Sequence, residues 1–395
     1  MIRVRHGRVT AILRRRPGAT EASVAVEPEG DDARAVGYDD LVGPLEVGDR
    51  VVLNTTAVAL GLGTGGFHLV MARLDRDRDD PGPGHVIKAR YTPAQVRVLA
   101  VEEEASPHRA AVESVVELGG LPVVCAELHS MVPVVAAAAR AAAPDARVAY
   151  VMTDGAALPL AFSRLAGELR ASGLVDGTVT AGQAFGGDLE AVTLHSALVA
   201  AREVLGAAVV VVAQGPGGAG TGTALGYSGV QMAEAVNAAG ALGGRPVACL
   251  RMSSADARER HRGVSHHSLT ALGRLALARA SVAVPVLDDP ELAAHVAAQL
   301  EAAGVAARHR LVPVEPPSPG KLLATWGLRV RTMGRGPDDD PVFFAAAAAA
   351  GTLAGQLAAG EVGGEAARAA EEPNAARAPA PAEPHSADEA AEGRA

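Results

Sequence analysis

The sequence has few cysteines and no excess of basic charge. Its 395 residues include two cysteines, Cys125 and Cys249, each inside an apolar run. This argues against a disulfide framework or a paired-cysteine zinc finger and favours a reducing compartment. Acidic residues outnumber basic ones by 45 to 36, which gives a net charge of −9 without any basic stripe. We therefore expect no nucleic-acid partner.

Long hydrophobic runs and a secretion signal are also missing. The first ten residues, MIRVRHGRVT, contain no apolar core of a signal peptide, and stretches such as AAVVVVAQG are too short to span a bilayer. With 49% hydrophobic and 21% charged residues, the composition is typical of a soluble globular protein. We expect a cytoplasmic protein with no membrane partner, and a homo-oligomer is compatible with the sequence.

Lysine is nearly absent as well, with Lys88 and Lys321 as the two examples among 36 basic residues. A coding preference for arginine explains this, but a retained lysine can also mark a position that needs a compact ammonium group. Lys88 in GHVIKARYTP and Arg335 in TMGRGPDDDP could each supply a cation to an anionic ligand. For both residues a solvated surface is the favoured explanation, and a role at the ligand is the alternative.

The chain divides into three parts that differ in residue composition and hydrophobic pattern. Residues 1–105 contain short β-branched runs broken by Gly, Pro and Asp, which predicts a small antiparallel barrel or sandwich. Residues 110–358 alternate apolar strands with amphipathic helices, which predicts an α/β domain with a mostly parallel sheet and helices on both faces. Residues 360–395 are Ala, Glu, Pro and Arg without aromatics, which predicts a disordered tail.

A histidine-serine pair recurs three times before an apolar helix. The pairs are His129-Ser130, His195-Ser196 and His267-Ser268, and the third is preceded by another histidine, His266. Serine is a favoured helix N-cap, and strand-to-helix loops of a parallel sheet share its carboxyl edge, where ligand clefts open. The helix dipole disfavours a nearby cation, so we expect neutral imidazoles that could ligate a metal or act as a base.

The pairs also have a purely structural interpretation, because a capping serine needs no function and the histidine can bond a neighbouring carbonyl. This interpretation is weakest for His266 and His267, which end a long polar loop. Two carboxylates follow strands in the same region. Asp154 and Glu127 could ligate a metal, act as a base or orient a histidine; Asp154 could equally be a turn former.

A glycine-rich segment follows a predicted strand that ends at Gln214. Its glycines match G-x-G-x-x-G and could let backbone amides approach an anion. Pro216 removes one donor, the helix begins only near Tyr227, and no Gly-Lys-Ser/Thr follows, so a nucleotide triphosphatase loop is excluded. We expect a ligand-binding segment that uses Gln214, Gly215, Gly217, Gly218 and Gly220.

Four stretches together, NTTAVALGLGTGGFHLV, GHVIKARYTP, ELHSMVPVV and RGVSHHSLTAL, carry a family resemblance. Over residues 1 to about 358 the chain resembles a bacterial family, common in actinobacteria, that is described only as a domain of unknown function. The resemblance implies a cytosolic bacterial origin and a single-family architecture. It implies no activity, substrate or cofactor.

These features predict a protein that binds a small phosphorylated or carboxylated ligand at the carboxyl rim of its sheet. The site would use His129, His195, His266, His267 and Asp154, with Ser130, Ser196 and Ser268 beside the ligand. One mechanism is acid–base catalysis by His266 or His267 without a metal. The alternatives are a histidine-ligated divalent-metal hydrolase or lyase, and a non-catalytic sensor or assembly module. The sequence leaves the cofactor unknown.

Overall fold

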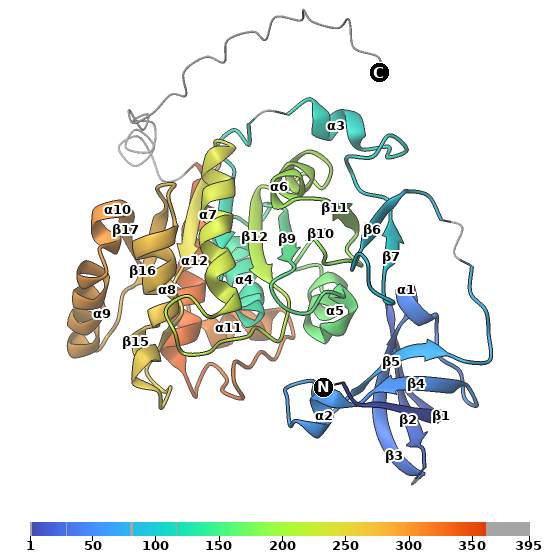
Figure 1. Ribbon diagram of the computed structural model, residues 1–395. Helices are drawn as coiled ribbons and strands as arrows, with labels where there is room; N and C mark the ends of the chain where they lie inside the picture. Colours follow the sequence, from blue (N-terminus) through green and yellow to red (C-terminus); the bar gives the residue numbers. More distant parts are fainter. Residues whose placement is uncertain (1, 29, 80–81, 116, 361–395) are drawn as a thin grey trace, which may run out of the picture. The chain divides into compact units, whose positions relative to one another are not determined.

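The computed structural model describes residues 2–28, 30–79, 82–115 and 117–360. It confirms the predicted fold class, because a closed N-terminal barrel precedes a large parallel sheet covered by helices (Figure 1). The boundary between the two predicted domains stays a prediction. Apart from Gly360, the tail predicted to be disordered lies outside the described residues.

Five strands close the N-terminal barrel in the order β1-β2-β3-β5-β4. Alternating apolar residues such as Val9, Val24 and Leu53 are fully buried inside it. All neighbouring strands are antiparallel except β3 and β5, which pair in parallel and so depart from the antiparallel expectation. The strands are β1 (Val4–Arg16), β2 (Ala19–Val26), β3 (Asp31–Tyr38), β4 (Arg50–Asn54) and β5 (His68–Arg73).

Between the barrel and the large sheet in the sequence, two short strands form an antiparallel ribbon, β6 (Val86–Lys88) and β7 (Val96–Val98). Lys88 is the last residue of β6. The ammonium group of Lys88 is buried and donates to the carbonyls of Thr180 (2.9 Å) and Ala184 (2.7 Å) and to the carboxylate of Glu190 (2.7 Å). Lys88 is therefore a structural tie to the edge of the large sheet, with every hydrogen bond of its ammonium used inside the protein.

The large sheet has eight strands among the described residues, in the order β11-β10-β9-β12-β8-β13-β16-β17. Every neighbouring pair is parallel. Its central strands are buried along their whole length, as expected for a sheet covered on both faces. The strands are β8 (Pro122–Cys125), β9 (Val148–Thr153), β10 (Gly177–Ala181), β11 (Leu189–Ala191), β12 (Val209–Gln214), β13 (Arg245–Cys249), β16 (Ser281–Pro285) and β17 (Arg310–Val314).

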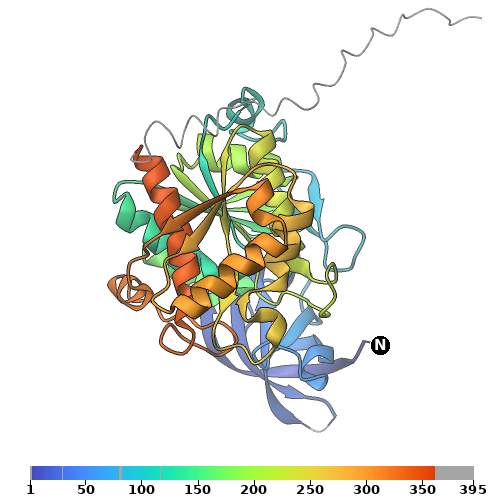
Figure 2. The same ribbon diagram turned by 90° about the vertical axis from the view of Figure 1, so that its left-hand side faces the viewer.

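Helices cover both faces of this sheet. The helices α4 and α12 pack together on one face, and α6 and α7 pack on the other (Figures 1 and 2). The helices of the described residues are α1 (Asp39–Val42), α2 (Thr56–Ala59), α3 (Arg109–Glu113), α4 (Val132–Ala142), α5 (Arg164–Ala171), α6 (Leu194–Glu203), α7 (Gln231–Ala241), α8 (His266–Thr270), α9 (Pro290–Ala302), α10 (Val305–Arg308), α11 (Pro319–Thr325) and α12 (Pro341–Ala359).

The chain reverses its direction across the sheet at the neighbouring strands β8 and β12. The connection after β8 runs through α4 on one face toward β9, and the connection after β12 runs through α7 on the other face toward β13. Loops that leave in opposite directions open a crevice at the carboxyl ends of such strands, and ligands of open α/β sheets bind there. This crevice is where the candidate site lies.

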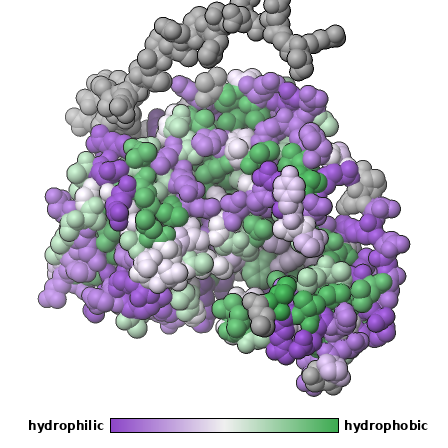
Figure 3. Space-filling model, viewed as in Figure 1, coloured by the Kyte–Doolittle hydropathy of each residue, from purple (hydrophilic) through white to green (hydrophobic). Residues whose placement is uncertain are grey.

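Helix α12 is long and apolar enough to cross a membrane by length and composition, but 72% of that stretch is buried inside the protein. It packs on α4 so closely that a Cβ at Gly351 would overlap the carbonyl oxygen of Val135. Hydrophilic side chains cover much of the molecular face seen in Figure 3. This helix is therefore a core element that covers one face of the α/β sheet.

Candidate functional site

Three histidines gather beyond the carboxyl end of β13. His261 lies in a 3₁₀ turn, Glu259–His261, while His266 and His267 begin α8. One ring nitrogen from each lies within 4.8 Å of the others. The ring centroids of His266 and His267 are 4.3 Å apart, and each is 5.1 Å from that of His261. We call these three residues the histidine cluster.

A short ribbon returns the chain so that His261 faces the start of α8. Strands β14 (Met252–Ser253) and β15 (Gly263–Val264) pair antiparallel on either side of the turn. Gln299 of α9 fixes the ribbon, since its amide accepts from the Val264 N–H (2.7 Å) and donates to the Arg262 carbonyl (3.0 Å). Gly263 has φ +67° and lies against Gln299, so a side chain there would displace this clamp.

An ionic network anchors the other half of the same loop. Asp256 pairs with Arg258 (2.7 Å) and with Arg335 (3.5 Å), and Arg335 in turn donates to the buried Asp340 (3.1 Å). Asp340 also accepts from the hydroxyl of Ser253 at 2.7 Å. Arg258 is the largest influence holding the pKa of Asp256 well below its usual range. Arg335 is therefore engaged in anchoring the loop.

Glu127, at the carboxyl end of β8, connects the sheet to the histidine cluster. Its Oε1 lies 2.6 Å from Nδ1 of His267 and 3.3 Å from Nη1 of Arg251, while Oε2 accepts from the hydroxyl of Ser268 (3.2 Å). Nη1 of Arg251 also lies 3.0 Å from the same Nδ1. Because the contact with Glu127 is the shorter one and a carboxylate can only accept, we assign the proton to Nδ1 of His267. The lone pair of His267 is then on Nε2.

Tyr227 holds the other side of His267. Its ring stacks on the imidazole with centroids 3.8 Å apart and an angle of 3° between the planes. Its hydroxyl donates to the backbone carbonyl of His267 at 2.6 Å. Because Glu127 fixes the ring edge and Tyr227 fixes the ring face, the imidazole of His267 has one defined orientation.

The other two histidines also leave a nitrogen available. Nδ1 of His261 lies 2.8 Å from the hydroxyl of Ser265, the N-cap of α8, while Nε2 of His266 is buried and bonds to no described residue. Burial, followed by the charges of Arg251 and Arg258, lowers the pKa of His261 to about 3. Burial, followed by His267 and Arg260, also lowers the pKa of His266. Both imidazoles are neutral at pH 7, the form that binds metals.

This arrangement could hold a divalent metal. Three imidazoles with a fourth open position are a typical catalytic zinc environment, and a carboxylate on the second nitrogen of a ligand is the usual support. Zn–N bonds of about 2.1 Å in a tetrahedral site require nitrogens roughly 3.4 Å apart. The nitrogens of the cluster, which lie within 4.8 Å of one another, would approach by up to about 1.4 Å on binding.

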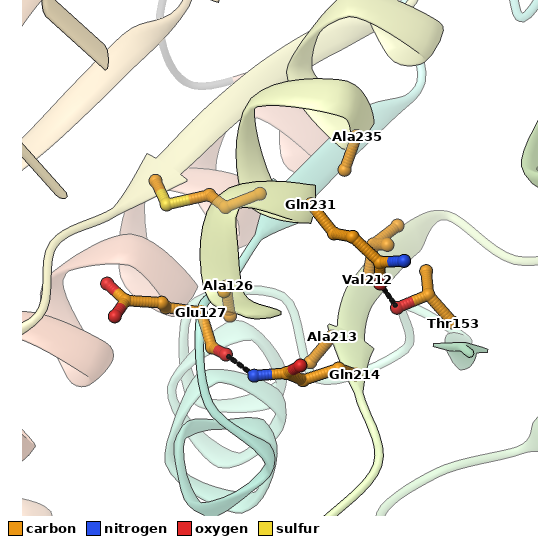
Figure 4. Close-up of a pocket in the computed structure, with 10 residues that line it drawn as sticks. Ala126, Glu127, Thr153, Val212, Ala213, Gln214, Gln231 and Ala235 are labelled. Carbon is orange, nitrogen blue, oxygen red and sulfur yellow. Dashed lines mark hydrogen bonds between the residues drawn. The ribbon is translucent and has the colours of Figure 1, made fainter. Parts of the chain in front are cut away.

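A small pocket lined by both apolar and polar residues lies beside Glu127, at the crevice between β8 and β12 (Figure 4). It has room for about one water molecule. The Gln214 side chain donates to the Glu127 carbonyl (3.0 Å), and the Thr153 hydroxyl donates to Gln231 (2.7 Å). Gln231 also donates to Asp154 at 3.2 Å, and the buried Oε1 of Gln214 bonds to no described residue. Asp154 thus supports Gln231, a residue of this pocket, and is not one of the three residues of the histidine cluster.

The three histidine-serine loops do not converge. His129 is buried between the Tyr150 hydroxyl (3.0 Å from Nδ1) and the Ser163 hydroxyl (2.6 Å from Nε2), so both of its nitrogens are used. Burial lowers the pKa of His129 to about 4. His195 is exposed beside β11, which is four strands from β8 and hence about 19 Å away along the sheet. Of these pairs, the third alone contributes to the histidine cluster.

The expectation that each serine caps its helix was wrong. The N-cap of α6 is Thr193, and Ser196 is its partner in a capping box; the N-cap of α8 is Ser265. Ser130 lies in a 3₁₀ turn and donates to Thr332 at 3.3 Å. Ser268 instead accepts from the Arg251 N–H (2.9 Å) and donates to Glu127, and so supports the site. Helix α8 continues after Thr270 as a π-helical turn that ends at Leu275.

The glycine-rich segment forms a hairpin against the cluster. The Thr221 N–H donates to the Gly226 carbonyl and the Ser228 N–H to the Ala219 carbonyl, both at 2.8 Å. A Cβ at Gly220 would lie 3.8 Å from Cε1 of His267. As predicted, the helix that follows begins only after Tyr227. Binding of a ligand by Gly215, Gly217 and Gly218 stays a prediction.

Sequence reasoning missed His261, Arg251 and Tyr227. The sequence did contain one signal for His261. Three of the twelve histidines, His261, His266 and His267, lie within seven residues. No local signal marked Arg251 or Tyr227, because their roles depend on contacts made across the sheet.

The fold and the site define an open α/β protein with a three-histidine cluster at the carboxyl edge of its sheet. Residues 34–351 match the model of a family described as a protein of unknown function (DUF3866), so the chain belongs to that family. The match begins within β3 and leaves the first two strands outside, whereas the resemblance covers them. No curated protein and no solved structure matches the chain.

Proposed function

We propose that the protein is a divalent-metal-dependent enzyme acting on a small anionic molecule, with His261, His266 and His267 as metal ligands. The observation that carries the proposal is the 2.6 Å contact between Glu127 and Nδ1 of His267. With the proton assigned to Nδ1, Nε2 of His267 is left to bind a metal, which is the role a carboxylate gives to a metal-binding histidine.

A bound metal with an open position would lower the pKa of a water molecule to near 7 or polarise a carbonyl of the substrate. Hydrolase and lyase reactions both use this chemistry. An anionic ligand suits the location, since the site lies at the carboxyl edge of the sheet beside an amide-rich hairpin. We further propose a cytosolic protein of bacterial origin, supported for the compartment by the unpaired, buried Cys125 and Cys249.

Elemental analysis of the full-length, untagged protein tests this proposal. We expect about one zinc, manganese or iron ion per chain. His261→Ala should lose the metal, while His195→Ala, which removes an exposed imidazole outside the cluster, should keep it. Protein that carries no metal and takes up no added Zn²⁺ would contradict the proposal.

The contact between Glu127 and Nδ1 of His267 also favours one alternative function, acid–base catalysis without a metal. A carboxylate that holds Nδ1–H leaves Nε2 of His267 to accept a proton from a substrate, as in other histidine–carboxylate pairs. The metal proposal accounts for two further observations, the neutral His261 and the unpartnered Nε2 of His266. A non-catalytic sensor stays a prediction of the sequence.

A further inference from the structure

Arg260 directly precedes the ligand candidate His261, and its guanidinium is exposed. Three other arginines of this region are each bound to a carboxylate: Arg251 to Glu127, Arg258 to Asp256, and Arg335 to Asp340. Within the part of the chain that the structure describes, no hydrogen bond or ion pair involves the Arg260 side chain. Its charge is therefore free for a ligand.

The hairpin formed by the glycine-rich segment lies against both Arg260 and His267. A Cβ at Gly222 would lie 3.6 Å from Cζ of Arg260, just as one at Gly220 would lie 3.8 Å from Cε1 of His267. Since these glycines are two residues apart, the guanidinium and the imidazole face adjacent stretches of one hairpin. Gly222 has φ +82°, which only glycine adopts readily. The hairpin can therefore approach both groups.

The charges around the cluster leave a positive surplus. The carboxylates of Glu127 and Asp256 are already paired with arginines, whereas Arg260 has no carboxylate partner among the described residues. A divalent cation and the Arg260 guanidinium would therefore attract a group that carries negative charge on two or more oxygens. One oxygen could bind the metal while the others accept from the planar fork of the guanidinium.

We propose that Arg260 is the specificity-determining residue of this site, and that it binds the phosphate or carboxylate group of a substrate whose neighbouring atoms lie at the histidine cluster. This inference rests on the proposed function for the metal, but the arginine can be tested separately. It names an oxyanion with at least two oxygens as the group recognised, and a residue that the sequence pattern did not single out.

The experiment uses the full chain loaded with Co²⁺, whose visible spectrum reports ligands that bind at the open position. Inorganic phosphate, acetate and azide are titrated separately. Loss of a charge-assisted hydrogen-bonded pair in Arg260→Gln should weaken phosphate or acetate binding by about 10- to 100-fold. Azide, which needs only the metal, should bind within about twofold of its original affinity. Whether phosphate or acetate shows the larger loss identifies the oxyanion.

Arg262→Gln is the matched control, because it removes the same charge from an exposed arginine two residues away. The atoms nearest to a Cβ at Gly222 belong to Arg260 and not to Arg262. The control should bind all three anions as the original protein does. Unchanged phosphate and acetate affinities in Arg260→Gln, with cobalt bound, would overturn the inference. Equal losses in both variants would also overturn it, by showing a general charge effect.

A metal-free arm separates this inference from the proposed function. If the protein takes up no Co²⁺, the metal proposal fails, and phosphate and acetate are titrated into the same protein by calorimetry. Binding that is lost in Arg260→Gln but kept in Arg262→Gln would sustain the role of Arg260. No measurable binding to the original protein at millimolar anion would reject it.

Discussion

Oε1 of Glu127 lies 2.6 Å from Nδ1 of His267, although the two residues are 140 positions apart in the chain. Glu127 lies two residues beyond the end of β8, and His267 lies in the first turn of α8, which comes after the neighbouring strand β13 in the chain. This contact joins the sheet to the histidine cluster. It also determines which nitrogen of His267 can bind a ligand.

Glu127→Gln should weaken metal binding. The amide keeps the shape of the side chain but lacks the charge that orients and polarises His267, so the affinity for Zn²⁺ should fall about 10- to 100-fold. Competition with a chelator of known affinity measures this. Glu104→Gln, which changes an exposed carboxylate, should have no effect. A folded Glu127→Gln protein with unchanged zinc affinity would remove Glu127 from the supporting role.

Tyr227→Phe should separate the stacking of Tyr227 from its hydrogen bond. The ring contact with His267 is kept while the 2.6 Å bond to its carbonyl is lost. We expect a loss of about 1–2 kcal/mol in the free energy of unfolding and metal affinity within a few-fold. Urea denaturation and the zinc competition measure the two effects. Tyr227→Ala, which loses both contacts, should lower the metal affinity further; equal affinities in the two variants would mean that stacking is unimportant.

Gly351→Ala should destabilise the packing of α12 on α4. The added methyl group would overlap the Val135 carbonyl oxygen, so we expect a cost of about 1–3 kcal/mol. Gly167→Ala in α5 is the matched control, because no atom lies within 4 Å of a Cβ at that exposed helical position. It should stabilise the protein by about 0.5–1 kcal/mol. Thermal or urea denaturation of both variants decides this, and a stabilised Gly351→Ala would show that the helices can separate freely.

Burial of His129 should make stability depend on pH. Its pKa is about 4 in the folded protein and near 6.5 in an unfolded chain. The unfolded state therefore binds the proton first, and stability falls as the pH drops from about 6.5 toward 4. This histidine should account for a loss of about 3 kcal/mol by pH 4, and His129→Gln should show a correspondingly flatter pH profile. An identical change in His195→Gln, at an exposed position, would argue against this origin.

The fold class was predictable because local signals agreed. Alternation of buried strands and apolar helices from Pro122 onward specifies a parallel sheet. Departures occurred where tertiary contacts outweighed local pattern. Ser268, whose residue type favours a helix cap, instead donates to Glu127, and Ser265 caps α8.

The candidate site was predictable in part. His266 and His267 were identified correctly as neighbours at a helix start, and Glu127 was among the carboxylates considered. The structure does not bring His195 to the cluster, because β11 is the edge strand of the sheet and the sequence carries no information on strand order. It does not bring His129 there either, because Tyr150 and Ser163, from later parts of the chain, contact both of its nitrogens.

The sequence by itself determined the local structure: where strands and helices form, which residues are buried, and that three histidines lie within one short loop and helix start. Those features follow from hydrophobic period, turn residues and capping, all of which act over a few positions. The tertiary structure decided which distant groups meet. It brought Glu127 and Tyr227 to His267 and left Arg260 unpaired beside them, because strand order and crossover direction depend on the packing of the whole sheet.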